Sequence, residues 1–136
     1  MEKGESIAEL KGHTGPIECC AISRDGSMYA SSSNDGTVRL WDARTNDVKH
    51  VLKDHEGEVD SVTLTPDGAV VISGCKDKLI RLWDVQKGEL LNKVSRHTGR
   101  VESLELSSDG ELLATGGGGG ETSVRLWEMK DLLTAK

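Results

Sequence analysis

The sequence contains no phenylalanine, one tyrosine and three tryptophans among its 136 residues. A hydrophobic core must therefore be built mainly from valine, leucine, isoleucine and alanine. Long apolar runs are also missing, since the longest is residues 69–72 and a membrane-spanning helix needs about 18 apolar residues. Residues 1–6 lack the apolar stretch of a signal peptide. We therefore expect neither a membrane span nor secretion.

Positive charge is also scarce. Seventeen lysines and arginines face 23 aspartates and glutamates, which gives a net charge of -6. Nucleic-acid binding relies on clustered lysine and arginine, and the densest cationic stretch, residues 76–81, contains Asp77. Three cysteines, none in a Cys-x-x-Cys motif, predict reduced thiols in an intracellular protein, with the cytoplasm favoured and the nucleus open. We expect no nucleic-acid, membrane or small-molecule partner.

What the sequence does contain is a repeat. Trp127 follows Trp83 by 44 residues instead of 42, and the run of five glycines at 116–120 accommodates the two extra residues. Three markers in register indicate a protein of three repeated units. The markers spaced by 42 residues are the histidines His13, His55 and His97, the Asp-Gly pairs at 25, 67 and 109, and the tryptophans Trp41 and Trp83.

Within each unit apolar residues alternate with a period of two, which is typical of strands. In the second unit, strand-like stretches at 59–64, 70–73, 80–83 and 90–94 are separated by short turns, which predicts a four-stranded antiparallel meander. We divide a single domain, 1–136, into repeats 11–52, 53–94 and 95–136. Residues 4–10 precede His13 as 88–94 precede His97, so the segment 1–10 is predicted to hold a strand that closes a blade. For residues 129–136 a helix and an incomplete fourth strand both remain open.

The unit endings carry a family resemblance. Residues 37–42 (Thr-Val-Arg-Leu-Trp-Asp) and 79–84 (Leu-Ile-Arg-Leu-Trp-Asp) resemble the Trp-Asp ending of the WD-repeat family, and Gly12-His13 resembles its Gly-His opening. One blade of that family has about 40–45 residues. The pattern departs at Asp54 and Arg96, which replace the glycine, and at Glu128, which replaces the final aspartate.

The resemblance implies an all-β fold of three four-stranded antiparallel propeller blades. Closed propellers usually have about four to eight blades. Three blades form an incomplete arc unless another chain or further repeats complete it, and each end of the arc would expose an apolar face. In closed members of the family an N-terminal strand completes the last blade. Two origins stay open: a piece of a larger propeller, or two copies that join into a six-bladed ring with exchanged strands.

A meander places the histidine loop and the loop between its second and third strands at the same rim. The resemblance implies a structural hydrogen-bond network in each blade, from tryptophan through serine or threonine and histidine to an acidic residue, and these buried polar groups can satisfy one another. The members are His13, Ser31, Asp35 and Trp41 in the first repeat, His55, Ser73, Asp77 and Trp83 in the second, and His97, Thr115, Glu121 and Trp127 in the third.

A catalytic reading of the same residues is less favoured. Ser31, His13 and Asp35 have the composition of a hydrolase triad, but the set recurs in every repeat with a tryptophan attached, which indicates architecture. Histidines that occur once per blade lie too far apart to share a metal ion. The glycine run is followed by Glu121 instead of the Gly-Lys-Ser/Thr of a phosphate loop. We expect no catalytic residue, no metal and no cofactor.

The remaining function is binding. By resemblance, the chain is predicted to be a non-catalytic scaffold that binds proteins or peptides through its rim loops; the alternative is a reader of peptides or modified residues at the propeller mouth. No large aromatic anchor stands among the rim positions. The candidate rim residues are Thr14, Pro16, Asn34, Glu56, Glu58, Lys76, Thr98 and Arg100.

Overall fold

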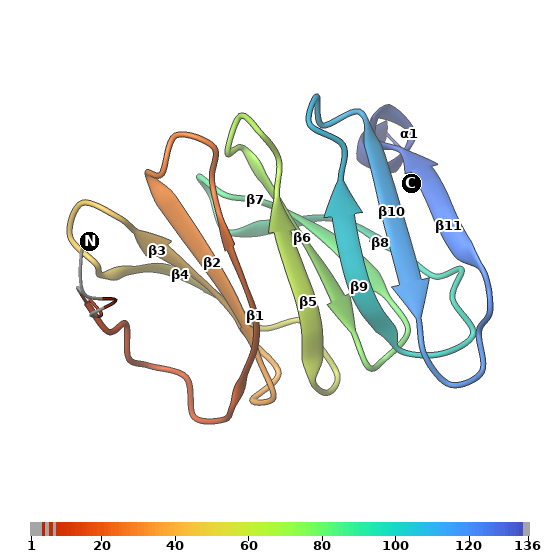
Figure 1. Ribbon diagram of the computed structural model, residues 1–136, viewed down its shortest axis with the longest axis horizontal. Helices are drawn as coiled ribbons and strands as arrows, with labels where there is room; N and C mark the ends of the chain where they lie inside the picture. The colour runs from red at the N-terminus through yellow and green to blue at the C-terminus, as the bar shows by residue number, and fades with distance from the viewer. Residues whose placement is uncertain (1–3, 5, 7, 135–136) are drawn as a thin grey trace.

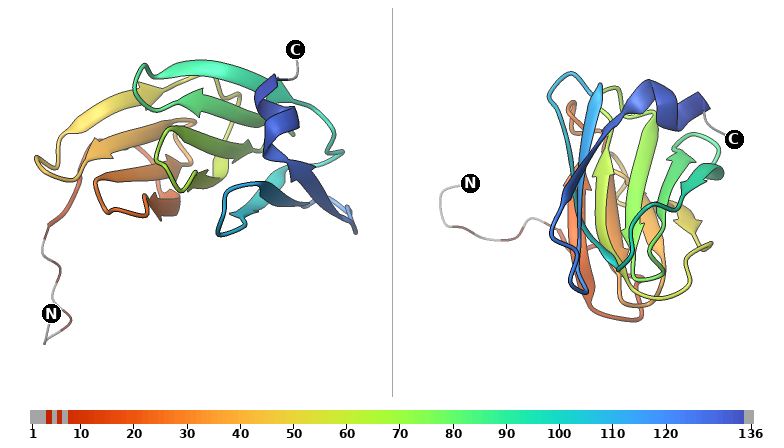
Figure 2. Two further views of the ribbon diagram at one scale, coloured as in Figure 1. Left: turned by 90° about the horizontal axis from the view of Figure 1, so that it is seen from above. Right: turned by 90° about the vertical axis from the view of Figure 1, so that its right-hand side faces the viewer.

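Three antiparallel sheets stand side by side along an arc (Figure 1), and the view from above shows its curvature (Figure 2). The computed structural model describes residues 4, 6 and 8–134. Blade 1 comprises β1 (Ile17–Ile22), β2 (Met28–Ser33), β3 (Val38–Asp42) and β4 (Val48–Leu52). Blade 2 comprises β5 (Val59–Leu64), β6 (Val70–Cys75), β7 (Ile80–Asp84) and β8 (Glu89–Val94), and blade 3 comprises β9 (Val101–Leu106), β10 (Leu112–Gly117) and β11 (Val124–Glu128). The predicted all-β class with three antiparallel blades is confirmed.

The Asp-Gly pairs form the turns between the first two strands of each blade, at the upper edge of Figure 1. In blade 1, Asp25 Oδ1 accepts hydrogen bonds from the Ser27 N–H at 3.0 Å and from the Ser23 hydroxyl at 2.9 Å. Gly26 follows with φ 75°, a left-handed conformation that glycine adopts without strain. The turns at 67–68 and 109–110 repeat this arrangement, with glycine φ values of 71° and 74°.

The core lies between the sheets and forms one cluster at each of the two seams, our term for the interface between neighbouring blades. Because side chains alternate along a strand, the two faces of blade 2 contribute to different seams. Trp83 on β7 faces blade 1, whereas its neighbour Leu82 faces blade 3. Blade 2 is therefore covered on both faces.

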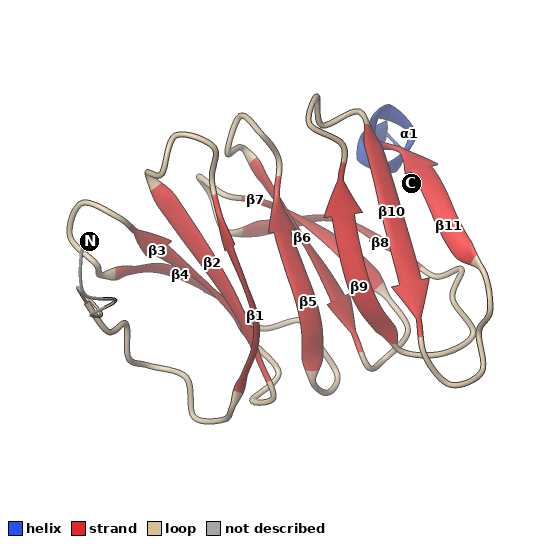
Figure 3. Cartoon of the chain, in the orientation of Figure 1, coloured by secondary structure: helices blue, strands red, loops and turns tan. Residues whose placement is uncertain are grey.

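The two ends of the chain differ from the regular pattern. Met129–Thr134 forms a short helix, α1, after β11 (Figure 3), so the described part of blade 3 has three strands instead of the four predicted. Met129 and Leu132 are 4% and 3% exposed, and the Asn92 side-chain amide donates to the Leu132 carbonyl at 2.7 Å. Of the two structures expected for residues 129–136, the helix therefore forms up to residue 134, where its side chains are buried against blade 2. Residues 135–136 lie outside the described residues.

The strand predicted over residues 4–10 does not appear in the part of this segment that the structure describes. Gly4, Ser6 and residues 8–10 belong to no strand, and residues 5 and 7 lie outside the described residues. A strand in this segment would need to pair with another strand whose edge is free. Among the helices of the described chain, none has the length and apolarity needed to cross a bilayer.

Candidate functional site

The histidine loops and the loops between the second and third strands meet at one rim of the arc, as the meander predicts. We call this the histidine rim, formed by residues 12–16, 34–37, 54–58, 76–79, 96–100 and 118–123. It lies at the lower edge of Figure 1, opposite the Asp-Gly turns. Beneath its surface lie the candidate hydrogen-bond networks.

Blade 1 brings its four network residues together. His13 Nδ1 lies 2.9 Å from Asp35 Oδ2, and His13 Nε2 lies 2.7 Å from the Ser31 hydroxyl. The Trp41 indole N–H donates to the same hydroxyl at 2.9 Å. Burial alone would raise the pKa of Asp35, but hydrogen bonds from Thr37 and His13 hold it well below its usual range. The carboxylate is therefore ionised and anchors the chain of hydrogen bonds.

Blade 3 builds the same arrangement with different residues. His97 Nδ1 lies 2.8 Å from Glu121 Oε2, His97 Nε2 lies 2.8 Å from Thr115 Oγ1, and the Trp127 indole donates to Thr115 at 2.9 Å. The hydrogen bond from His97 lowers the pKa of Glu121. A side chain on Gly117 would collide with the Glu121 carboxylate. The glycine-rich loop thus makes room for the longer acidic side chain.

Blade 2 departs from the expected network. His55 Nε2 lies 2.8 Å from the Ser73 hydroxyl, which also accepts the Trp83 indole N–H at 3.2 Å. The expected link from His55 to Asp77 is absent. Asp77 instead accepts hydrogen bonds from the Arg81 guanidinium at 2.6 and 3.2 Å.

The cause of this departure is Asp54, which stands where blade 1 has Gly12. Asp54 Oδ2 accepts from Arg81 Nε at 2.8 Å, so the guanidinium is held between two carboxylates and is 1% exposed. Burial would raise the pKa of Asp77, but the hydrogen bond from Arg81 keeps it lowered. The sequence showed the Gly-to-Asp departure but not its consequence, which is a buried arginine held between two carboxylates.

His55 is left with a buried Nδ1 atom that has no hydrogen-bond partner among the described residues. Desolvation by burial, together with the positive charge of Arg81, lowers the pKa of His55 to about 4. The imidazole is consequently neutral near pH 7. Its ring centroid lies 5.5 Å from that of Trp83, compared with 6.5 Å between His13 and Trp41 in blade 1.

The hydroxyls that a triad would use as nucleophiles are covered. Ser31, Ser73 and Thr115 are 8%, 0% and 1% exposed, and each contacts a tryptophan indole. A nucleophile must be reachable by substrate, so the geometry favours a structural role. Over residues 4, 6 and 8–134, no group of three or more His, Cys, Asp or Glu side chains has the arrangement to hold a metal ion.

The eight candidate rim residues fall into two groups. Six are exposed: Thr14, Pro16, Asn34, Glu56, Lys76 and Thr98. Glu58 and Arg100 are half-buried and joined at 3.0 Å, and Arg100 also binds Asp60 at 2.7 Å. The Asn34 amide, in the orientation that satisfies its neighbours, donates to Glu58 at 2.8 Å. Polar contacts at the rim therefore cross both seams.

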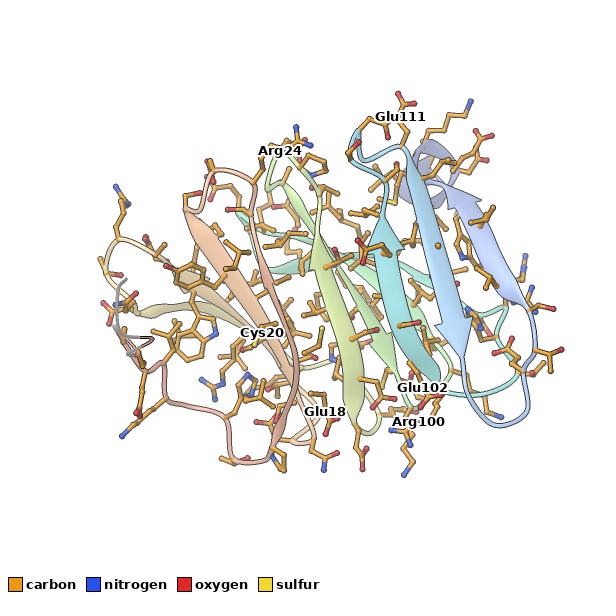
Figure 4. The ribbon with its side chains drawn as sticks, viewed as in Figure 1. Glu18, Cys20, Arg24, Arg100, Glu102 and Glu111 are labelled. Atoms are coloured by element: carbon orange, nitrogen blue, oxygen red, sulfur yellow. The ribbon has the colours of Figure 1, made fainter. Side chains whose placement is uncertain are left out.

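Sequence reasoning missed three acidic residues next to this rim: Glu18, Asp60 and Glu102. Each sits in a β-bulge near the start of the first strand of its blade, where the pairing register shifts. A bulge redirects a side chain, and Figure 4 shows Glu18, Glu102 and Arg100 at the same end of the sheets. Their spacing of 42 residues was a signal that could have identified them.

A known family model covers all three repeats, and individual known proteins match shorter stretches of the chain. A family model described as "WD domain, G-beta repeat" matches residues 4–42, 46–84 and 88–128. Serine-threonine kinase receptor-associated protein from Homo sapiens is 58% identical over 38 residues, which are 28% of this chain and 11% of that protein. Small ribosomal subunit protein RACK1 from Candida albicans is 44% identical over 45 residues, or 33% of this chain and 14% of that protein. THO complex subunit 6 homolog from Danio rerio is 40% identical over 52 residues, or 38% of this chain and 16% of that protein. The matches span between 11% and 16% of these relatives' lengths.

Proposed function

Because the chain belongs to the WD-repeat family, we propose that it is a non-catalytic scaffold that binds other proteins or peptides through the loops of its histidine rim. The observation that carries this proposal is the support beneath those loops. The Asp35 carboxylate accepts the Thr14 backbone N–H at 3.0 Å, and the Asp77 carboxylate accepts the Glu56 backbone N–H at 3.2 Å. In blades 1 and 2 the acidic side chain thus fixes the backbone of the rim loop above it.

A rim that is already ordered loses little conformational freedom when a partner docks, which favours binding. The contact from Arg100 to Glu58 and Asp60 adds rigidity across the second seam. Six exposed candidate residues then stand on a fixed base. This is a platform for protein contacts, and the net charge of -6 favours a protein partner over nucleic acid.

The intracellular setting is part of the proposal. The three cysteines are free thiols: Cys75 is buried, Cys20 is exposed and Cys19 is intermediate. Desolvation by burial raises the pKa of Cys75 to about 11, so this thiol stays protonated and unreactive. Unpaired thiols are typical of a reducing compartment.

A reader of modified residues would need a tight pocket at the mouth of the propeller. The cavity of about 610 Å³ lies instead near the opposite rim, between blades 1 and 2, where Asp42, Asp67 and Lys49 line it. A second cavity of about 350 Å³ opens on the outer face of blade 1. Neither position favours the reader over the scaffold.

A paired substitution tests the proposal. The double variant Glu56→Arg/Thr98→Arg reverses the charge of one exposed side chain of the histidine rim and replaces another with a larger, positively charged one. The control variant Glu111→Arg makes a similar charge reversal at an exposed position beside the opposite turn (Figure 4). Proteins that co-purify with the wild-type chain are identified, and their affinities are measured with purified components. We expect the rim variant to weaken binding at least about tenfold and the control to leave it within about twofold. Equal binding by both variants would contradict the rim as the docking surface.

A further inference from the structure

Blade 3 stands at the right end of the arc in Figure 1, and its outer face carries apolar residues at repeat positions that are buried in the other blades. Val124 is 71% exposed and Leu126 is 72% exposed. Ile80 and Leu82 hold the same positions in blade 2 and are both 0% exposed, because they pack against blade 3. The face therefore has the composition of a seam but lacks its neighbour.

The opposite end of the arc, the outer face of blade 1, leaves the other kind of seam face uncovered. Ile17 is 49% exposed and Ile22 is 66% exposed, whereas Val59 and Leu64 at the same positions of blade 2 are 0% and 8% exposed. The cavity of about 350 Å³ opens here, and apolar side chains line most of it, Tyr29 among them. This face is shaped to receive a neighbouring blade.

The two uncovered faces are complementary by construction. Both internal seams join the same two kinds of face: Leu40 clusters with Val71 across the first seam, and Leu82 clusters with Leu113 across the second. Leu126 occupies the position of Leu40 and Leu82. Blade 3 of one copy therefore presents to blade 1 of another copy the pair of surfaces that already packs twice within the chain.

The free edge of β11 adds a second observation. The corresponding edges of β3 and β7 are paired with β4 and β8, but no described strand pairs with this edge of β11. The family match begins at the same point of each repeat, at residues 4, 46 and 88, so residues 4–10 correspond to β4 and β8. In the register of β7 and β8, Arg81 lies opposite Lys93. The same register places Glu9 opposite Arg125.

The charges around this position identify the missing strand. In blade 2, Asp54 in the loop binds both cations, Arg81 at 2.8 Å and Lys93 at 3.2 Å. In blade 3 the loop residue has the opposite charge, because Arg96 stands where blade 2 has Asp54, while Arg125 corresponds to Arg81. Two positive charges therefore lie near this position. A strand that completes blade 3 should carry a carboxylate where β8 carries Lys93.

Glu9 supplies that carboxylate. In the isolated chain its side chain is 73% exposed, and Lys11 lies at 3.8 Å. Arg125 Nε is buried without a hydrogen-bond partner among the described residues, and it lies 3.5 Å from Glu121. Arg96 contacts the carbonyl of its neighbour Ser95. An incoming Glu9 would lie between these two arginines.

We propose that two copies of this chain close into a six-bladed ring, in which the N-terminal segment around Glu9 of each copy supplies the fourth strand of blade 3 of the other. Glu9 of one copy then pairs with Arg96 and Arg125 of its partner, and the outer face of each blade 3 packs on the outer face of the other blade 1. Both seams are equivalent under a two-fold axis, so the assembly closes and does not grow into a fibre. The inference is independent of partner binding at the histidine rim.

Light scattering with size exclusion at micromolar concentration measures the mass. We expect about 29 kDa, twice the 14.7 kDa of the chain. Leu126→Asp should weaken association by on the order of 100-fold, because each of two seams loses a buried leucine and gains a buried carboxylate. The matched control is Leu91→Asp, at a position that is 47% exposed on β8 and outside both end faces. The control should keep the wild-type mass.

Exchange of the charges tests the strand itself. Glu9→Arg alone and Arg96→Glu alone should each weaken association by about tenfold or more, because both seams of either homodimer would carry like charges. A mixture of the two variants should restore association to within about threefold of wild type. In a mixed dimer the two substituted side chains have opposite charges and meet in one seam, while the native pair occupies the other. Both positions are exposed in the isolated chain, and circular dichroism checks their folding.

A monodisperse wild-type monomer would overturn the proposal. So would polydisperse aggregates, which would indicate that further repeats of a longer propeller cover these faces. Equal masses for Leu126→Asp and Leu91→Asp, or no restoration in the mixture, would also overturn it.

Discussion

The middle blade and the third blade share one sequence pattern but have different structures. Leu82 and Leu126 occupy the same position of the repeat, yet the first is 0% exposed and the second is 72% exposed. Over the described residues, blade 2 has four strands and a neighbour on each face, whereas blade 3 has three strands and one neighbour. The burial of an apolar side chain in a propeller blade therefore depends on whether a neighbouring blade covers it, and not only on its position in the repeat.

The comparison extends to the arginine before each tryptophan. Arg81 in blade 2 is 1% exposed and bound by two carboxylates, whereas Arg125 in blade 3 is 37% exposed and lies 3.5 Å from Glu121. The two blades differ here in the preceding loop, which carries Asp54 in blade 2 and Arg96 in blade 3, and in the fourth strand, which pairs with β7 but not with β11 in the described chain. The same framework thus holds a buried, doubly paired arginine in one blade and a half-exposed arginine in another.

The largest contrast is expected for truncation of the two equivalent leucines. Leu82→Ala should lower the free energy of unfolding by about 2–5 kcal/mol, because it leaves a cavity in the second seam. Leu126→Ala should change it by less than about 0.5 kcal/mol in dilute, monomeric chain, because the side chain is exposed there. Urea denaturation of both variants measures the difference. Similar losses would remove the contrast between the blades.

A smaller effect is expected from the acidic residues under the rim. Asp77→Ala should cost about 2–4 kcal/mol, because buried Arg81 loses one of its two carboxylates, while Asp35→Ala should cost about 1–3 kcal/mol. The control is a pair of double-mutant cycles. Asp77 should couple to Arg81 by more than about 1 kcal/mol and to His55 by much less. Strong coupling to His55 instead would restore the uniform network that the sequence suggested.

These residues show which parts of the structure could be predicted from the sequence. The period of 42, the turn chemistry and the alternation predicted three antiparallel blades and placed His13 beside Asp35, since these depend on local geometry repeated in register. The exchange of partners at Asp77 could not be predicted, because it depends on which of two side chains, Arg81 or His55, reaches the carboxylate. That choice is made by Asp54, 23 residues earlier in the chain.

The end of blade 3 was open for a related reason. Residues 129–134 are short and have no strong period, so the sequence permitted either a helix or part of a strand. The helix forms where Leu132 can be buried and its carbonyl can accept the Asn92 amide. Tertiary contacts with blade 2 thus decide what local preference does not.

The third expected effect is a pH dependence that belongs to blade 2. An ordinary histidine pKa is about 6.5, while that of folded His55 is about 4, because burial and the charge of Arg81 disfavour the imidazolium. The unfolded chain therefore binds this proton first, so stability is complete above pH 6.5 and is lost as the pH falls towards 4. We expect a loss of roughly 2–3 kcal/mol over this window.

Denaturation midpoints at several pH values, with His55→Gln as the control, test this prediction. The control should flatten the dependence between pH 6.5 and 4, where ordinary carboxylates contribute little. If the stability of His55→Gln depended on pH as steeply as that of the wild type, a group other than His55 would be responsible.

Hydrogen exchange of the β7 and β11 backbone amides at two protein concentrations tests most directly that the neighbour makes the difference between the blades. The amides of β7, which lie between β6 and β8, should be protected equally at both concentrations. The amides on the free edge of β11 should exchange rapidly in dilute chain and gain protection at high concentration, when a second copy supplies the missing strand. Edge amides of β11 that exchange at the same rate at both concentrations would contradict the account.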